Sequence, residues 1–418
     1  MTEILQRAIL VGVDLNGEAG FTYSMEELEN LAQACEVEVL EHVTQNLQRV
    51  NKATYIGTGK VEEIRLAVER QEANLVIFND ELSPSQIRNL EDGTQCKVID
   101  RTILILDIFA KRAKTREAML QVEIAQLKYM MPRLIGLGAS LSRQQGGIGS
   151  KGPGEKKLEM DRRRIEEQIT RLEKELDSLV LARQTQRKAR QKQETPTVAL
   201  VGYTNAGKST TMNALLDMMT AESSKQVFEK DMLFATLETS TRRITLADKK
   251  EFLLTDTVGF VSKLPHHLVK AFRSTLEEVM EADLLLHIVD LAHPDFEAQM
   301  KITNQVLEEL GVKDIPMIYV YNKCDLASDF EIPAGADAVK ISAKKSLNID
   351  GLLEVVKSHI FQNYVTATFL IPYDQGSWVS HLNEKAEVLA TKHLEGGTKM
   401  TANCSNHDYQ ALKKYEVQ

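Results

Sequence analysis

The feature that most constrains this chain is a glycine-rich motif between two segments of different periodicity. In TVALVGYTNAGKST, four residues separate Gly202 from Gly207, and Lys208 and Ser209 follow. An apolar, strand-like run precedes the motif. The last two residues of the motif, Lys208 and Ser209, are the first residues of the helix-like run KSTTMNALLDMM. In that context the backbone N–H groups of the loop surround phosphate oxygens, the lysine reaches the β- and γ-phosphates, and the serine binds Mg²⁺. The motif therefore predicts a nucleoside triphosphate site after a buried strand.

Strand-like and helix-like segments alternate strictly from Thr197 to about Phe361. Apolar runs such as EFLLTDT, DLLLHIVDL and PMIYVYN predict buried strands, and amphipathic runs such as FEAQMKITNQVLEEL and IDGLLEVVKSHIF predict helices. Such alternation is typical of a doubly wound, mostly parallel sheet with helices on both faces. For residues 196–362 we therefore expect an α/β fold of the P-loop type.

Three further motifs follow, each at the end of a predicted strand. In DTVG, Asp256 is expected to hold Mg²⁺ through water, and the Gly259 N–H to contact the γ-phosphate. In NKCD, Asp325 can accept hydrogen bonds from guanine N1 and the 2-amino group, a donor pair that adenine lacks. The backbone of SAK, residues 342–344, is expected to contact guanine O6. Because parallel strands end at one edge of a sheet, the motifs predict one site that selects GTP over ATP.

This set of motifs resembles the translation-factor-related GTPases. The resemblance implies a Mg²⁺-binding threonine in LFATLETSTRR, where Thr236 fits the family position best and Thr239 and Thr241 are alternatives. The expected metal ligands are Ser209, Thr236 and Asp256. The residues expected to act in hydrolysis are Asn205, Lys208, Thr236 and Gly259. The residues expected to contact GTP or GDP are Gly202, Tyr203, Thr204, Asn205, Ala206, Gly207, Lys208, Ser209, Thr210, Asp256, Gly259, Asn322, Lys323, Asp325, Ser342, Ala343 and Lys344.

Two residues bear on how fast GTP is hydrolysed. Ras-like enzymes carry a water-orienting glutamine after the DxxG glycine, and this chain has Phe260 there. A phenyl ring cannot make the required hydrogen bond, so we expect slow intrinsic turnover. Asn205 has two interpretations. In GTPases that resemble this chain, asparagine here coordinates K⁺, which would neutralise charge developing during hydrolysis. Alternatively, Asn205 only tolerates the turn conformation of the loop.

Sequence patterns divide the remaining residues into three parts. Residues 1–108 predict a small α/β domain with strands at RAILVGVDL, NLVIFND and CKVIDRTILIL and helices at SMEELENLAQAC and VEEIRLAVERQ. Residues 109–195 predict an antiparallel helical hairpin whose first helix ends at Pro132 and whose second spans residues 158–192. Residues 363–418 predict a small α+β module with a strand at ATFLIP, a helix at SWVSHLNEKAEVLA and a strand at KMTANCS.

Positive charge is concentrated in the predicted hairpin. Between residues 109 and 195 there are 20 lysines and arginines and 11 aspartates and glutamates, a balance of +9 in a chain of net charge −9, so the other residues carry −18. The stretch QQGGIGSKGPGEKK joins the two helices and lacks the spacing of a phosphate-binding loop. Such a cationic tip suits irregular, phosphate-rich RNA. The alternatives are a solvated connection and a protein partner. The residues expected to contact RNA are Arg143, Lys151, Lys156, Lys157, Arg162, Arg163 and Arg164.

Motifs outside the nucleotide site narrow the resemblance. The stretches YIGTGKVEEI, VIDRTILILDIFAKRAKTREAMLQVEIAQLKY, GGIGSKGPGE, LEMDRRRI and LTDTVGFVSKLPHHLVKAFRSTLEE resemble the HflX-type GTPases, and the resemblance spans about residues 1–360. It implies a GTPase that binds the large ribosomal subunit and its rRNA through the N-terminal domain and the helical arm. It also implies that stalled or idle ribosomes are dissociated, notably in stress, and that ribosomes stimulate GTP hydrolysis. The alternative function is a GTP-gated ribosome-assembly or RNA-remodelling factor.

Other features of the sequence bear on whether the chain has a second nucleotide site and on where in the cell the protein works. ATP binding has been proposed for the N-terminal part of the family, but GTGK (Gly57–Lys60) lacks a serine or threonine after the lysine, so we interpret it as a turn that opens a helix. The N-terminal apolar run, Ala8–Val13, is too short for a signal sequence, and no run approaches the ~18 apolar residues of a membrane helix. The four cysteines lack C-x-x-C spacing, which favours a reducing compartment. We expect a cytoplasmic monomer that does not insert into membranes.

Overall fold

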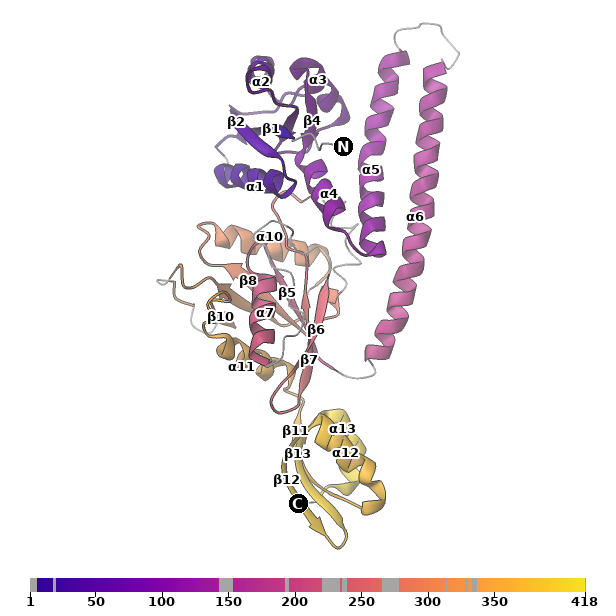
Figure 1. Ribbon diagram of the computed structural model, residues 1–418, viewed down its shortest axis with the longest axis vertical. Coiled ribbons are helices and arrows are strands. Elements are labelled where there is room, and N and C mark those ends of the chain that lie inside the picture. Colours follow the sequence, from indigo (N-terminus) through magenta and orange to yellow (C-terminus); the bar gives the residue numbers. More distant parts are fainter. Residues whose placement is uncertain are drawn as a thin grey trace.

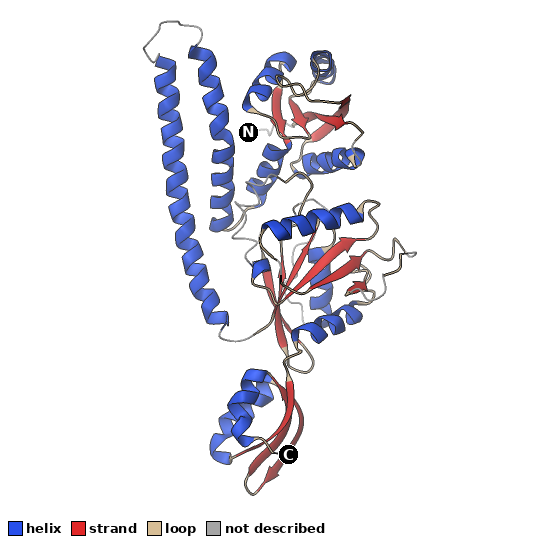
Figure 2. Cartoon of the chain, turned by 180° about the vertical axis from the view of Figure 1, so that it is seen from behind, coloured by secondary structure: helices blue, strands red, loops and turns tan. Residues whose placement is uncertain are grey.

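The computed structural model describes residues 6–17, 20–142, 153–191, 195–219, 234, 239–264, 278–312, 314–327, 330–332 and 337–417, without the side chains of 134–142, 153–158, 183–191 and 219. An N-terminal α/β domain, a helical hairpin, a central α/β domain and a C-terminal module follow one another along the chain (Figure 1). The N-terminal domain packs on the central domain, and the hairpin lies beside the N-terminal domain. The C-terminal module extends from the opposite end of the central domain (Figures 1 and 2).

The N-terminal domain contains a four-stranded parallel sheet in the order β2-β1-β3-β4. Its strands are β1 (Arg7–Leu15), β2 (Glu38–Leu47), β3 (Leu75–Phe78) and β4 (Lys97–Asp100). Its helices are α1 (Phe21–Ala34), α2 (Thr58–Gln71), α3 (Pro84–Thr94) and α4 (Arg101–Arg112). Successive residues of a strand point to opposite faces. Ala8 and Leu10 therefore pack with α1 and α4, whereas Ile9 and Val11 pack with α2 and α3.

The structure of this domain corrects one expectation and adds two elements. The run CKVIDRTILIL is not a single strand, because β4 ends at Asp100 and α4 begins at the next residue. The Asp100 carboxylate accepts a hydrogen bond of 3.0 Å from the Ile103 N–H and so caps the first turn of α4. Strand β2 and helix α3 were not among the expected elements. The expected boundary between residues 108 and 109 falls within α4.

The helical hairpin consists of α5 (Arg116–Ser142) and α6 (Pro153–Gln191), which pack against each other (Figure 2). The longer α6 lies on the outside, and α5 lies between it and the N-terminal domain (Figure 1). The apolar seam of the hairpin is made by the buried residues Leu120, Ile124, Ile169 and Leu172. The hairpin thus buries the apolar stripe of each helix against its partner, as the sequence pattern indicates.

The expected end of the first hairpin helix at Pro132 is wrong, because α5 continues to Ser142. A proline inside a helix removes one hydrogen bond and clashes with the preceding turn. Tertiary contacts on both sides of the proline offset this local cost. The Arg133 guanidinium forms an ion pair of 3.0 Å with buried Asp100, and the Tyr129 hydroxyl donates to the same carboxylate. These contacts fasten α5 to the N-terminal domain.

The central domain has a six-stranded sheet in the order β10-β9-β8-β5-β7-β6, and β6 is antiparallel to its neighbour. Its strands are β5 (Thr197–Gly202), β6 (Ser240–Thr245), β7 (Glu251–Asp256), β8 (Leu284–Asp290), β9 (Met317–Asn322) and β10 (Ala338–Lys340). Helices α7 (Lys208–Met219) and α11 (Ile349–Ile360) pack on one face, and α10 (Phe296–Glu309) packs on the other. The expected doubly wound, mostly parallel α/β fold is confirmed.

The C-terminal module is a three-stranded antiparallel sheet in the order β11-β13-β12, packed against short helices. Its elements are β11 (Val365–Ile371), η1 (Tyr373–Gln375), α12 (Gly376–Lys385), β12 (Glu387–Leu394), β13 (Gly397–Cys404), α13 (Asn406–Leu412) and η2 (Lys413–Tyr415). The expected helix SWVSHLNEKAEVLA is too long, because its last residues belong to β12. Among the described residues, none of the helices combines the length and the apolar character that crossing a bilayer requires.

Candidate nucleotide-binding site

The phosphate loop joins the end of β5 to the start of α7. Gly202 and Gly207 have φ angles of 145° and 95°, which a residue with a side chain rarely adopts. A Cβ at Gly202 would also overlap the Ile288 carbonyl oxygen of the neighbouring strand β8. Asn205, with φ of 60°, is left-handed as well, and its side chain is exposed. The loop therefore has the tight, backbone-lined shape that surrounds phosphate groups.

Lys208 is buried beneath this loop. Its ammonium group donates hydrogen bonds to the carbonyl oxygens of Gly202 and Tyr203 at 3.2 and 2.8 Å. Burial lowers the pKa of Lys208 to about 8, and the carboxylate of Asp256 acts in the opposite direction. A bound phosphate would supply the negative charge that a buried ammonium group lacks. The structure thus places a cation at the position expected to contact the β- and γ-phosphates.

Ser209 and Asp256 lie together beside the phosphate loop. The Ser209 hydroxyl at the start of α7 donates a hydrogen bond of 2.6 Å to the Asp256 carboxylate at the end of β7. Hydroxyl and carboxylate oxygens are the ligands that Mg²⁺ prefers, so this donor set fits the expected metal. The third expected ligand, Thr236, lies outside the described residues.

The motifs expected to bind guanine converge on the same edge of the sheet. Asn322 at the end of β9 donates a hydrogen bond of 2.8 Å to the Ala206 carbonyl, and its side-chain oxygen accepts one of 3.0 Å from the Ala343 N–H. One buried amide therefore connects the phosphate loop to the SAK loop. Hydrogen bonds from Ser342 and from Lys345 lower the pKa of Asp325. Asp325 is thus held as a carboxylate, the form that accepts two hydrogen bonds from guanine.

The remaining expected contacts have different surroundings. The Lys323 ammonium group forms an ion pair of 2.7 Å with Asp290 at the end of β8, and Lys344 is exposed. The phenyl ring of Phe260 is buried among apolar residues between the sheet and α10, and it does not face the phosphate loop. Gly259 lies so close to the loop that an added Cβ would be 2.7 Å from Thr204 Cα and 2.8 Å from Lys208 Nζ. The γ-phosphate contact expected of its N–H is therefore sterically restricted to glycine.

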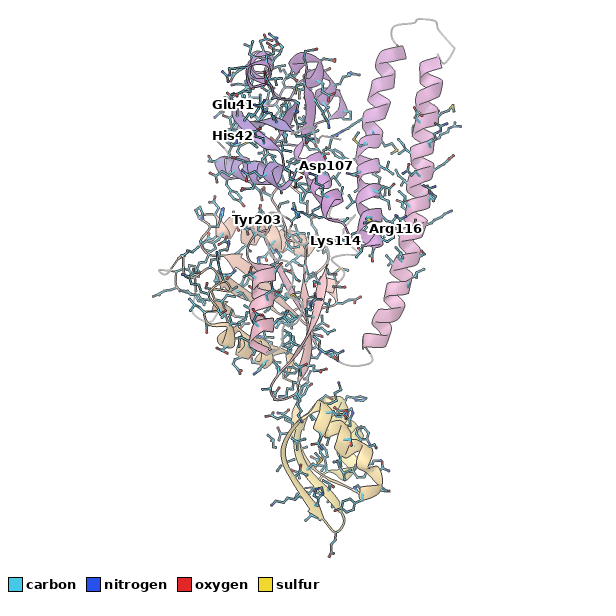
Figure 3. All side chains as sticks on the ribbon, viewed as in Figure 1. Glu41, His42, Asp107, Lys114, Arg116 and Tyr203 are labelled. Carbon is cyan, nitrogen blue, oxygen red and sulfur yellow. The ribbon has the colours of Figure 1, made fainter. Side chains whose placement is uncertain are left out.

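A buried polar cluster that the sequence patterns did not predict joins this site to the N-terminal domain. Tyr203 lies at the boundary between the two domains (Figure 3), and its side chain reaches α1. Its hydroxyl donates a hydrogen bond to Glu27 on α1, whose carboxylate also pairs with Arg101 on α4. The available signal was a charged residue within an apolar run, since Arg101 interrupts CKVIDRTILIL.

Comparisons with known proteins agree with this geometry. Three family models match consecutive segments: a GTP-binding GTPase N-terminal domain at residues 22–110, a GTP-binding GTPase middle region at 112–190, and a 50S ribosome-binding GTPase at 197–323. The GTPase HflX of Caldanaerobacter subterraneus subsp. tengcongensis is 46% identical over 413 residues, which cover 99% of this chain and 94% of that protein. The chain belongs to the HflX family of GTPases. It is accordingly a GTPase that binds guanine nucleotides and hydrolyses GTP.

Other HflX proteins match over most of their length. The GTPase HflX of Escherichia coli K12 is 40% identical over 377 residues, which cover 89% of this chain and 87% of that protein. Among solved structures, a GTP-binding protein from the hyperthermophilic archaeon Sulfolobus solfataricus in complex with GDP is 23% identical. That match has a TM-score of 0.44 and covers 86% of this chain and 99% of the archaeal chain.

The lowered pKa of Lys208 leads to a testable pH dependence of GTP binding. Phosphate favours the protonated lysine, so GTP affinity is expected to be constant below the pKa of about 8 in the free protein. Above it the affinity should fall, by up to about tenfold for each pH unit. Calorimetric titration with GTP between pH 7 and 9 measures this change. Guanosine, which has no phosphate, controls for titration of the base. Its affinity, measured by competition, should change less between pH 7 and 9 than the affinity of GTP does. A GTP affinity that stays constant to pH 9 would contradict the account.

Proposed function

We propose that this HflX-family GTPase binds the large ribosomal subunit and, in its GTP-bound form, dissociates stalled or idle ribosomes. The observation that carries the proposal is the long hairpin of α5 and α6, which is attached to the N-terminal domain, and this domain packs on the GTPase domain (Figure 1). The family model that matches residues 197–323 is described as a 50S ribosome-binding GTPase. GTP would favour the docked state of the protein, and hydrolysis would release it.

The charged end of α6 supports an RNA partner for the hairpin. Arg162, Arg163 and Arg164 are exposed near the start of α6. Each forms an ion pair within the helix, Arg162 with Glu166 at 2.8 Å, Arg163 with Glu159 at 3.3 Å and Arg164 with Asp161 at 3.8 Å. Exposed ion pairs of this kind contribute only about 0–1 kcal/mol, so the arginines can exchange these partners for phosphates at little cost. The other residues expected at the tip have side chains outside the described set.

We also propose that the chain works in four parts with different roles. Residues 1–108 and 109–195 would contact the ribosome, residues 196–362 would bind and hydrolyse GTP, and residues 363–418 would form an accessory module. Mg²⁺ would be held by Ser209, Asp256 and a threonine, for which Thr236 is the proposed residue, and it would neutralise charge on the phosphates. Because Phe260 cannot orient water, intrinsic turnover would be slow and the ribosome would supply the missing assistance.

The tip of the hairpin tests the ribosomal interaction. Replacing Lys151, Lys156 and Lys157 with alanine is expected to weaken ribosome binding by about tenfold or more at physiological salt, because each lysine is expected to contact a phosphate. Each lost phosphate contact should also lower the slope of log affinity against log salt concentration by about 0.7–0.9. GTP affinity should not change. Co-sedimentation with purified ribosomes over a range of salt concentrations measures the ribosome affinity and its salt slope, and nucleotide titration measures the GTP affinity. The triple variant Lys392→Ala, Lys399→Ala, Lys414→Ala makes the same charge change in the C-terminal module and should bind as the unchanged protein does. Equal ribosome binding by both triple variants would count against a role for the tip.

Asn205 tests whether K⁺ assists hydrolysis. Because its backbone is left-handed, with φ of 60°, Asn205→Gly removes the side chain and keeps a favourable backbone conformation. If the side chain coordinates K⁺, the variant should lose the stimulation of GTP turnover that K⁺ gives over Na⁺ at equal ionic strength. If Asn205 only tolerates the turn, the glycine variant should retain that stimulation. Initial rates of phosphate release in the two salts distinguish these outcomes.

A further inference from the structure

The contact between the N-terminal domain and the phosphate loop is built from one closed hydrogen-bond network. The Glu27 carboxylate on α1 accepts hydrogen bonds from the Tyr203 hydroxyl, the Ser262 hydroxyl and the Arg101 guanidinium. Arg101 also donates to the Ser262 hydroxyl at 3.0 Å, and the Ser262 N–H donates to the Tyr203 hydroxyl at 2.6 Å. The Tyr203 and Ser262 hydroxyls each donate one of these hydrogen bonds and accept another. The network is therefore a single arrangement and not a loose collection of surface contacts.

The network is buried and charged, which makes it sensitive to the loss of a member. The side chains of Glu27 and Arg101 are both 2% exposed. Burial, and next the Glu27 charge, raises the pKa of Tyr203, so the phenol keeps the proton that it donates. Removing one partner of a buried charged pair leaves the other without compensation. The carboxylate of Glu27 therefore fixes the tyrosine of the phosphate loop in one position.

The hydrogen-bond network lies at the part of the N-terminal sheet where α/β folds usually bind a ligand. In the parallel sheet β2-β1-β3-β4, β2 is added on one side of β1, and β3 and β4 are added on the other side. Ligands of such sheets bind at the carboxyl ends of the strands near this switch between β1 and β3. Asn79 directly follows β3, accepts a hydrogen bond of 2.9 Å from Arg101 and donates one of 2.8 Å to Ser24 on α1. Tyr203 and Ser262 of the central domain are thus bound at the crevice of the N-terminal sheet.

Apolar contacts from the same segments reinforce the interface. Val258, directly before Gly259, and Val261, two residues after it, are buried in one cluster with Leu104 and Phe109 of α4. Phe234, two residues before the proposed metal ligand Thr236, packs its ring edge-to-face on Phe109 with centroids 4.6 Å apart. The residues around the γ-phosphate contact are therefore packed against α1 and α4 and not against solvent.

We propose that Glu27 is a positioning residue for GTP hydrolysis, which holds Tyr203 and Ser262 so that Gly259 faces the γ-phosphate. Ser262 lies three residues beyond Gly259, and Tyr203 directly follows the first glycine of the phosphate loop. The N-terminal domain is then part of the GTPase machinery, and binding of GTP changes the strength of its contact with the central domain. Such coupling is reciprocal, so a ligand of the N-terminal domain changes GTP affinity by the same factor. The inference depends on the GTPase reaction and not on the ribosomal partner.

The variants Tyr203→Phe and Ser262→Ala test the proposal in the full-length protein without ribosomes. Each removes one hydroxyl that donates to Glu27 and leaves the Glu27–Arg101 pair intact. Affinity for a non-hydrolysable GTP analogue and kcat for GTP are each expected to fall about tenfold, the usual effect of losing a hydrogen bond to a charged group. GDP affinity should fall less than analogue affinity, because GDP lacks the γ-phosphate that Gly259 faces. Ser262→Thr, which keeps a hydroxyl, should restore most of the activity.

Two controls separate positioning from a general effect on folding. Tyr409→Phe removes a comparable hydrogen bond, 3.0 Å to Glu416, in the C-terminal module, and Glu41→Gln breaks an exposed pair with Arg70 far from the central domain. Both should leave the ratio of analogue affinity to GDP affinity unchanged. A purely structural role for Glu27 would lower the melting temperature of Tyr203→Phe without changing this ratio. An unchanged ratio in both test variants, or a rise in their turnover, would overturn the proposal.

Discussion

Replacing Lys208 with alanine is expected to reduce GTP turnover by about 100-fold or more, the size of effect seen when one preorganised group that stabilises developing charge is removed. The lysine is buried beneath the phosphate loop and bound to the carbonyl oxygens of Gly202 and Tyr203. Among the residues that the structure describes, Lys208 is the only buried lysine. The measurement is steady-state phosphate release at saturating GTP, together with the dissociation constants of GTP and GDP.

The second glycine-lysine motif provides the matched control. Lys60 in GTGK lies in the first turn of α2, where its ammonium group forms an ion pair of 2.7 Å with Glu63. The structure thus agrees with the interpretation of this motif as a turn that opens a helix. Lys60→Ala is expected to leave GTP turnover within about twofold, since i,i+3 ion pairs along a helix contribute little and the pair lies in the N-terminal domain. Equal losses in Lys60→Ala and Lys208→Ala would mean that the phosphate site is incorrectly assigned.

Asp325→Asn is expected to lower GTP affinity by about 100-fold or more and to create affinity for xanthosine triphosphate. Sites built to hydrogen-bond a substrate reject an analogue that leaves their polar groups unpaired, by about 10⁴-fold in favourable cases. Xanthine carries an oxygen where guanine carries the 2-amino group, so the asparagine amide can donate where the aspartate accepted. Competition between GTP and xanthosine triphosphate for a fluorescent nucleotide measures the change.

A distant aspartate serves as the control for this change of specificity. Asp374 lies in the short helix η1 of the C-terminal module, and Asp374→Asn makes the same change of charge. The preference for GTP should remain as it is in the unchanged protein. If Asp325→Asn kept that preference as well, another residue would select the base, and the assignment of NKCD would be wrong.

Motifs that act through local backbone geometry could be predicted from the sequence. In the phosphate loop, Gly202 and Gly207 have positive φ angles that favour glycine. Asp256, Asn322 and Ser342 lie at or just beyond the ends of strands whose carboxyl ends meet at one edge. Strand and helix periodicity was sufficient to predict the alternating elements of the central domain. Which residues bind nucleotide or metal remains a prediction, because the structure shows only that these side chains are brought together.

Features that depend on distant contacts could not be predicted in the same way. The apolar run after Asp100 suits a strand or a helix equally, and the capping hydrogen bond to Ile103 decides for the helix. Pro132 ends a helix by local rules, but the contacts of Arg133 with the N-terminal domain override them. The pair of Glu27 and Arg101 joins residues 74 positions apart. Periodicity carries no information about such a pairing.

The central claim is that a GTPase with slow intrinsic turnover is activated by the ribosome that it dissociates. The most direct measurement is GTP turnover in K⁺ buffer with and without purified ribosomes, while light scattering reports subunit dissociation. The account expects ribosomes to stimulate turnover strongly and scattering to fall when GTP is present. Stimulated turnover without a change in scattering would favour an assembly or RNA-remodelling factor. If ribosomes changed neither turnover nor scattering, the proposed function would be contradicted.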